Sequence, residues 1–432
     1  MMNPLLELRK HGQSLWYDNM RRGLITSGEL ERMRDEDGLA GLTSNPTIFE
    51  KAISDSTDYD ADISQMVSQD SEIEDIYLAL VVRDIQLAVD VLRPVYEASS
   101  GRDGFGSLEV SPLLAYDTQA SIESARALFR ALDRPNVMVK IPGTAQGIPA
   151  IEQCIGEGIN INVTLLFDID NYEKVAWAYI RGLERLAAAG RPIDRVASVA
   201  SFFVSRVDTA TDKQLEERIR AARDDGERER LRSLLGKAGI ANAKLAYQRF
   251  KKIFGDDRWR ALADKGARVQ RCLWASTGVK NPLYRDVMYV EGLLGPDTVD
   301  TVPQATMDAF REHGRVAPML EQGQEEARDQ LKAVAEVGID FKAITERLQV
   351  DGVELFSDSY RKLLDGLRAK RDAILAQEGR HYFAALGPYS KRVDDRLAAM
   401  ASERFSRRLW AKDASLWKDD PAAQDIIKNR LG

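Results

Sequence analysis

The chain has 432 residues, of which 44% are hydrophobic and 30% are charged, and its formal net charge is −7. The charged residues form no long block of one sign, which argues against a nucleic-acid partner. No stretch of about 18 apolar residues occurs, so we expect no membrane-spanning segment. The N-terminal residues show no secretory signal, and the only two cysteines lie in mostly apolar surroundings. We therefore expect reduced thiols and a cytoplasmic location.

Short β-branched or apolar runs alternate with longer segments of helical spacing, a pattern typical of a parallel sheet with crossover helices. Helical spacing is clearest over residues 73–96, 121–131 and 172–189, and N-cap oxygens are available at Asp117 and at 357–359. The number of strands fits a closed (β/α)8 TIM-type barrel of the α/β class. The eight predicted strands are 13–17, 38–42, 106–110, 136–141, 159–166, 196–203, 270–275 and 298–302.

Two regions exceed a minimal barrel. Residues 208–268 predict a charged helical insertion between strands six and seven, and its simplest role is a solvated helical hairpin. We assign residues 1–375 to the barrel and 376–432 to a C-terminal helical extension or a truncated linker to a further domain. Within this tail, residues 379–389 are expected to connect and 392–409 to form a helix.

Lys140 ends a β-branched strand, directly before a turn at Pro142 and Gly143. Dehydrating an ammonium group is costly, so burial favours the neutral amine. A neutral amine attacks ketones to form a Schiff base. The plainer interpretation is a strand-end lysine that reaches solvent, and the other strand ends decide between the two.

Histidines number only three and are widely separated, which argues against a histidine-based zinc site and against a Ser-His-Asp triad. We therefore expect no metal and no cofactor. The chemistry has to rest on lysine, carboxylates, amides and hydroxyls.

In a parallel barrel the active site lies at the carboxyl ends of the strands. Seven predicted strands end in polar side chains. Each has an ordinary explanation, such as a helix cap for Asp18 or a surface salt bridge for Arg206, but seven at one rim indicate a shared site. The polar residues at these ends are Asp18, Asn45, Glu109, Lys140, Asn162, Thr164, Ser201, Arg206 and Ser276.

The chain resembles the transaldolase family over roughly residues 1–370. The resemblance rests on four long motifs in the family's order, namely GLTSNPTIF at 41–49, VKIPGT at 139–144, GININVTLLF at 158–167 and ASFFVSRVD at 200–208. It implies a class I aldolase-type barrel that uses no metal. The implied reaction moves a dihydroxyacetone unit from sedoheptulose 7-phosphate or fructose 6-phosphate to glyceraldehyde 3-phosphate or erythrose 4-phosphate, in the non-oxidative pentose phosphate pathway.

The same resemblance implies roles for the strand-end residues. Lys140 forms the Schiff base, and Asp18 removes the proton of the C4 hydroxyl. Glu109 serves formation and breakdown of the carbinolamine through a water that Thr164 orients. The remaining matches bind substrate: Asn45 and Asn162 through their amides, Ser201 as a supporting hydroxyl and Arg206 at the phosphate.

Phosphate recognition departs from the family's best-known pattern. A second arginine usually follows the strand-seven serine closely, whereas Ser276 is followed by Thr277, Gly278, Val279 and Lys280. We predict that Lys280 takes this role, with Arg285 as the next candidate.

The tail near residues 416–431 resembles the junction of fused transaldolase–glucose-6-phosphate isomerase proteins, which implies an isomerase domain in a longer native polypeptide.

Two alternative functions remain open. A fructose-6-phosphate aldolase would release free dihydroxyacetone, but such relatives are about half this length. A non-catalytic sugar-phosphate-binding barrel would not need Asp18, Glu109 and Lys140 together.

Overall fold

The computed structural model describes residues 3–54, 56–379 and 387–428. The chain divides into two compact units. The first comprises the residues up to Ile53 together with Val81–Leu363, and the second comprises Ser54–Leu80 together with the chain from Leu364 onward. The assignment of 1–375 and 376–432 as the domains stays a prediction.

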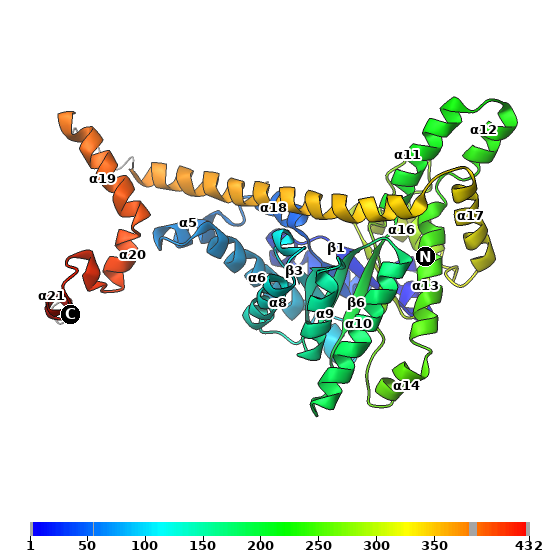
Figure 1. Cartoon of the computed structure of the whole chain (residues 1–432), viewed down its shortest axis with the longest axis horizontal. Coiled ribbons are helices and arrows are strands. Elements are labelled where there is room, and N and C mark those ends of the chain that lie inside the picture. The colour runs from blue at the N-terminus through cyan, green and yellow to red at the C-terminus, as the bar shows by residue number, and fades with distance from the viewer. Residues whose placement is uncertain (1–2, 55, 380–386, 429–432) are drawn as a thin grey trace. The chain divides into compact units, whose positions relative to one another are not determined.

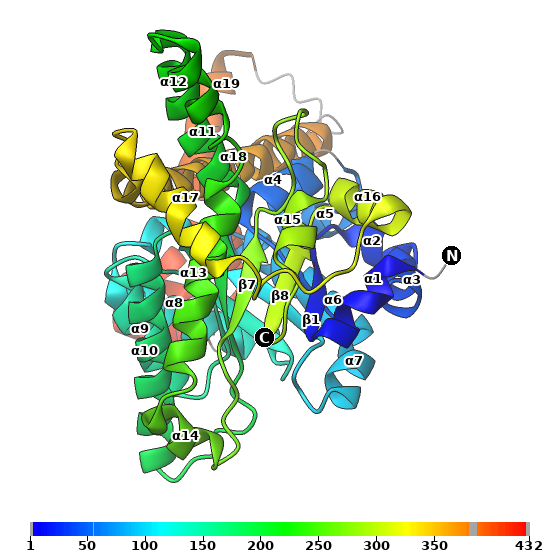
Figure 2. The same cartoon turned by 90° about the vertical axis from the view of Figure 1, so that its right-hand side faces the viewer.

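The first unit is built on a closed barrel of eight parallel strands in chain order, which confirms the predicted fold class (Figure 1). Figure 2 shows β7, β8 and β1 side by side, where the last strand closes onto the first. The strands are β1 Gln13–Asp18, β2 Gly41–Thr43, β3 Phe105–Glu109, β4 Val137–Pro142, β5 Ile161–Leu166, β6 Ser198–Phe203, β7 Arg271–Ala275 and β8 Thr298–Val302.

The predicted strands agree with the observed ones within a few residues, and β2 deviates most. It was predicted over 38–42 but begins at Gly41. Gly38 has a left-handed backbone with φ 73°, which belongs to a turn and not to a strand. The strand therefore starts only after this turn.

The strands are apolar because parallel strands are covered on both faces. Every residue of β4, β5 and β6 is buried. Large side chains from several strands form one hydrophobic core, including Trp16, Phe105, Met138, Leu273 and Val299. Polar side chains also occur in the strands, for example Gln13 and Arg271 at the amino ends of β1 and β7, and the carboxyl ends carry the polar residues that the sequence predicts for the site.

Helices surround the barrel. Helix α8 begins after Asp117, whose carboxylate accepts from Ala120 N at 2.9 Å, so this predicted cap is confirmed. Before β6, the helical segments are α1 Pro4–Leu8, η1 Arg9–His11, α2 Arg22–Thr26, α3 Glu29–Glu36, α4 Pro46–Ser54, α6 Ile73–Val91, α7 Arg93–Ala98, η2 Pro112–Leu114, α8 Thr118–Leu132, α9 Gly147–Gly156 and α10 Ile169–Ala188. After β7 they are α15 Met288–Gly292, α16 Gln304–His313, α17 Gln324–Glu336 and α18 Phe341–Gly379.

The predicted helix start at 357–359 is wrong, because α18 runs through these residues without interruption. Phe356, Tyr360 and Leu363 continue its buried face across the serines. The Ser359 hydroxyl bonds to that of Thr47 at 2.7 Å and does not cap a helix. Side-chain packing on both sides of the run thus overrides the local capping signal.

Four helices lie between β6 and β7, namely α11 Ser205–Ala221, α12 Asp225–Arg232, α13 Ala238–Ile253 and α14 Asp257–Ala263. Helix α13 packs against α10 and α11. Leu215 of α11 and Leu231 of α12 share a second hydrophobic cluster with Val334 of α17. Figure 1 shows α11, α12 and α17 near one another. These helices are therefore anchored by apolar contacts.

The second unit contains α5 Asp60–Ser68 and the later part of α18, joined by an ion pair of 2.7 Å between Lys370 and Asp60. Its other helices are α19 Ser390–Ser402, α20 Phe405–Trp410 and α21 Pro421–Lys428, with short η3 Gly387–Tyr389 and η4 Ala414–Leu416. Most of the expected connector at 379–389 lies outside the described residues. No helix in the described ranges is long and apolar enough to cross a membrane.

Candidate active site

A cavity of about 180 Å³ opens at the carboxyl ends of the barrel strands. Glu109 and Asn162 are the two predicted site residues that do not line it, and both contact residues that do. The predicted residues in the wall are Asp18, Asn45, Lys140, Thr164, Ser201, Arg206, Ser276 and Lys280.

Lys140 is buried at the end of β4, with only 5% of its surface exposed. The register of the sheet places Glu109 of β3 on one side and Asn162 of β5 on the other. The Lys140 Nζ donates to the Ser44 carbonyl at 2.8 Å and lies 3.3 Å from Glu109 Oε2. The amine is thus held inside the barrel mouth, which rules out a side chain that simply reaches solvent.

Glu109 is the carboxylate nearest to this amine. Burial raises its pKa, and the neighbouring Lys140 acts in the opposite direction. Its Oε2 forms an ion pair with the Lys140 Nζ, and its Oε1 has no partner among the described residues. A buried oxygen such as Oε1 needs a partner from solvent or substrate, so Glu109 is suited to exchange a proton next to the amine.

Asp18 ends β1 and faces the same cavity. Its Oδ1 accepts from the Thr43 hydroxyl at 2.8 Å, and Thr43 is bonded in turn to Thr301 at 2.8 Å. Burial raises the pKa of Asp18, and the charges of Lys140 and Arg206 lower it, as does the Thr43 hydrogen bond. The net effect is a raised pKa, and the hydrogen bond from Thr43 fixes the orientation of the carboxylate.

The amides of the site are oriented by neighbouring groups. Asn162 Nδ2 donates to Ser107 Oγ at 3.0 Å, and Asn162 Oδ1 accepts from Ser201 Oγ at 2.7 Å. Asn45 Oδ1 accepts from Ile48 N at 3.0 Å, which leaves its amide hydrogens for other partners. Such amides bind hydroxyl groups without changing charge.

Two residues at the rim have an unusual backbone. Leu165, directly after Thr164, has φ 59°, and Ser276 has φ 56°. The β5–β6 register shifts between Val163 and Leu166, so β5 carries one extra residue. A left-handed conformation costs a non-glycine residue about 1–2 kcal/mol, and such strain often accompanies function. The Thr164 hydroxyl has no hydrogen-bond partner in the described part of the chain.

The cationic side of the cavity is formed by Arg206 and Lys280. The Arg206 guanidinium lies 5.3 Å from the ring centre of Phe203 and 6.0 Å from that of Phe356. Burial lowers the pKa of Arg206, and the Asp18 charge raises it. Arg285, in contrast, is paired with Glu291 at 2.7 Å and does not line the cavity.

Several residues of the cavity were not predicted. Thr301 is the penultimate residue of β8, and its position near a strand end is the sequence signal that points to it. Thr43 lies in the GLTSNPTIF motif at 41–49, where no sequence signal distinguishes it from its neighbours. Phe356 comes from α18 and has no sequence signal that connects it with the barrel rim.

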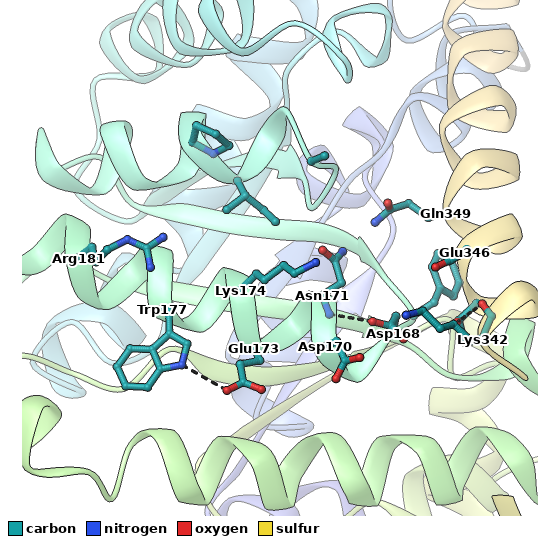
Figure 3. A pocket seen from close by; sticks show the side chains of 15 residues that line it. Asp168, Asp170, Asn171, Glu173, Lys174, Trp177, Arg181, Lys342, Glu346 and Gln349 are labelled. Atoms are coloured by element: carbon teal, nitrogen blue, oxygen red, sulfur yellow. Dashed lines mark hydrogen bonds between the residues drawn. The ribbon is translucent and has the colours of Figure 1, made fainter.

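A larger hollow of about 850 Å³ lies between α9, α10 and the start of α18 (Figure 3). Its labelled side chains include Asn171, Trp177, Lys342 and Gln349. It contains none of the predicted site residues. Within the described ranges, no group of three or more His, Cys, Asp or Glu residues is placed to hold a metal ion.

Comparison with known proteins agrees with this geometry. The family model for transaldolase/fructose-6-phosphate aldolase matches residues 15–367. Transaldolase 2 of Nostoc sp. is 48% identical over 372 residues, which are 85% of this chain and 98% of the relative. The transaldolase of Thiobacillus denitrificans is 47% identical and covers 84% of this chain and 99% of its own.

A third relative, the transaldolase of Thermobifida fusca, is 44% identical over 84% of this chain and 97% of its own length. Relatives matched over nearly their whole length give no support to the expected fusion with an isomerase. The chain belongs to the transaldolase family of Schiff-base-forming transferases.

Proposed function

We propose that Lys140 carries the Schiff base through which this protein transfers a dihydroxyacetone unit between sugar phosphates. The observation that carries the proposal is the buried Lys140 amine, 3.3 Å from Glu109 and in one cavity with Asp18. A binding site alone does not need a buried amine beside Glu109 in a cavity that Asp18 also lines. The two free, buried cysteines are consistent with a reducing compartment, and we place the activity in the cytoplasm.

The first step is imine formation. The Lys140 amine adds to the C2 carbonyl of a ketose phosphate, loses a proton and gives a carbinolamine. Glu109 exchanges the protons of this step through a water that the Thr164 hydroxyl orients, and the carbinolamine loses water to form a protonated imine. The raised pKa of Glu109 suits a group that has to both take and return a proton.

The second step breaks the C3–C4 bond. Asp18 accepts the proton of the C4 hydroxyl, the C3–C4 electron pair moves toward the iminium nitrogen, and the aldose phosphate leaves as an aldehyde. A three-carbon enamine remains on Lys140. The Asn45 and Asn162 amides hold its hydroxyl groups, and the hydrogen bonds of Asn162 fix its orientation.

In the return half-reaction, C3 of the enamine attacks the aldehyde carbon of the acceptor. Asp18 returns its proton to the new C4 hydroxyl, and water releases the product ketose from Lys140. Arg206 and Lys280 bind the phosphate at the far end of each sugar, because a phosphate needs concentrated positive charge and directed donors.

The test is reduction with borohydride in the presence of fructose 6-phosphate, followed by peptide mass spectrometry. We expect the added mass on the peptide that contains Lys140. Lys140→Met should give neither adduct nor turnover. Lys342→Met, which removes an exposed lysine of the larger hollow, is the control and should behave as the unaltered protein.

Adding erythrose 4-phosphate separates transfer from simple cleavage. We expect sedoheptulose 7-phosphate and little free dihydroxyacetone. Free dihydroxyacetone as the main product would identify a fructose-6-phosphate aldolase instead. An adduct on Lys280, or tight binding without any adduct, would refute the assignment of Lys140.

A further inference from the structure

We propose that Gln349 is a positioning residue that holds the irregular end of β5 and thereby directs Thr164 into the active-site cavity. The proposal rests on the function proposed above for Lys140 and Thr164. Gln349 lies on α18, outside the cavity, and lines the larger hollow.

The contact joins one side chain to the ends of two catalytic strands. Gln349 Nε2 donates to the carbonyl of Gly143 at 3.0 Å and to that of Leu165 at 3.1 Å. Gly143 follows the strand of Lys140, and Leu165 directly follows Thr164. In Figure 3 the Gln349 side chain extends away from α18. It therefore links β4 and β5 at the point where both enter the site.

The segment that Gln349 holds is strained. Leu165 has a left-handed backbone with φ 59°, and the ladder to β6 shifts register at this residue. Such a conformation persists only where surrounding contacts enforce it. A side-chain amide that binds the Leu165 carbonyl supplies one of these contacts.

Helix α18 also approaches Leu165 closely. A Cβ atom at Gly352 would lie 2.8 Å from Leu165 Cδ2, so the helix backbone packs directly on the end of this side chain. Gln349 precedes it by about one helical turn. The same helix thus packs on the Leu165 side chain and bonds its carbonyl, and two contacts fix this residue.

The two carbonyls differ in how much they depend on Gln349. The Gly143 carbonyl also accepts from Asn171 Nδ2 at 2.6 Å, so it keeps a donor when Gln349 is replaced. The effect should therefore be greater at β5 than at β4. Thr164, with a buried hydroxyl that no described residue binds, is the group whose position should change.

This reasoning predicts which chemical step suffers. Thr164 serves the water-dependent steps, namely formation and hydrolysis of the imine, whereas Asp18 serves carbon–carbon cleavage. Gln349→Met keeps the length of the side chain and removes its donor. We expect it to slow formation of the trapped adduct about 10-fold, which is less than the roughly 10²–10⁴-fold that proton-transfer catalysis contributes, because Gln349 acts only through the position of Thr164.

The assay is rapid mixing with fructose 6-phosphate, quenching with borohydride at successive times, and mass spectrometry of the Lys140 peptide. The six-carbon adduct and the three-carbon adduct differ in mass and report imine formation and cleavage separately. For Gln349→Met, both adducts should appear more slowly while their ratio stays the same. A change in the ratio would place Gln349 on the cleavage step and overturn the proposal.

Two further variants distinguish positioning from general destabilisation. Gln349→Lys retains a donor and should be closer to the unaltered rate than Gln349→Met. Glu346→Gln changes an exposed residue of the same hollow and should leave the rate unaltered. Equal loss in Gln349→Lys and Gln349→Met would show that the hydrogen bonds do not matter.

A double-mutant cycle gives the decisive result. In a Thr164→Ala background, Gln349→Met should cause little additional loss, because the group that it positions is already gone. If the rate of the double variant falls by the product of the two single reductions, the residues act independently and the proposal is overturned. If Thr164→Ala alone leaves the adduct rate unaltered, the proposed role of Thr164 fails. If Thr164→Ala slows the rate and Gln349→Met does not, only the role of Gln349 fails.

Discussion

Asp300 offers a quantitative test of the structure beside the active site. It is fully buried on β8, and its Oδ1 accepts from the Thr277 hydroxyl at 3.0 Å. Its Oδ2 has no hydrogen-bond partner among the described residues. Burial raises the pKa of Asp300 from 3.8 to about 7, against the lowering effect of Thr277. We expect this carboxyl to lower the stability of the folded protein at high pH.

The magnitude follows from linkage. The pKa of Asp300 is higher in the folded protein than in the unfolded chain. Between pH 3.8 and about 7 the folded protein therefore keeps a proton on this carboxyl that the unfolded chain has lost. The contribution to stability is complete below about pH 3.8 and is lost as the pH rises through 7. At about 1.4 kcal/mol per pKa unit, a shift of about three units gives a loss of about 4 kcal/mol.

Asp300→Asn removes this dependence because the amide does not titrate. Its additional N–H group, left without a partner, costs about 1–3 kcal/mol at every pH and shifts only the baseline. The free energy of unfolding of Asp300→Asn minus that of the unaltered protein should therefore rise by about 4 kcal/mol between pH 4 and 8.

The measurement is urea unfolding followed by tryptophan fluorescence, since the buried Trp274 pairs in register with Asp300. Asp329→Asn, an exposed position of α17, is the matched control and should follow the unaltered protein at all pH values. A difference for Asp300→Asn that is constant with pH, or that falls as the pH rises, would refute the reasoning.

The remaining expectations concern the reaction. Asp18→Asn should reduce transfer by about 10²-fold or more while a six-carbon adduct is still trapped, and loss of trapping would instead show a structural role. Arg206→Ala should raise KM for fructose 6-phosphate steeply and also lower kcat, because phosphate binding positions the ketose. Lys280→Ala should act in the same way but more mildly, since an ammonium fixes geometry less firmly than a guanidinium. Neither change should matter on unphosphorylated fructose; equal losses there would contradict a phosphate role.

The barrel could be predicted from the sequence because its signals are local. A parallel strand that is buried on both faces gives an uninterrupted apolar run, and the spacing of such runs sets the topology. The prediction is wrong at element boundaries that depend on a contact distant in sequence or on the backbone of a single glycine. The left-handed backbone of Gly38 means that β2 begins later than predicted. The buried side chains of Phe356 and Tyr360 keep α18 helical across the serines that predict a helix start at 357–359.

The predicted site follows the same division. Residues at strand ends share one rim by topology alone, so Asp18, Lys140 and Arg206 could be grouped without a structure. Phe356 and Gln349 could not, because α18 reaches the barrel only through long-range packing. The sequence favours Lys280 over Arg285, and in the structure Lys280 lines the cavity whereas the Arg285 guanidinium is paired with Glu291.

The arrangement of charges links phosphate binding to the strength of the base. The charges of Arg206 and Lys280 both lower the pKa of Asp18. If a phosphate dianion binds between them, as proposed above, it offsets part of their positive charge and weakens this effect. The Asp18 carboxylate then becomes more basic when a phosphorylated sugar is in place, at the moment when it has to take the C4 proton. A sugar without phosphate leaves both cations uncompensated and the base weaker. Loss of Arg206 by itself removes a charge that lowers the pKa of Asp18, so the expected fall in kcat for Arg206→Ala follows from poorer positioning of the ketose and not from a weaker base.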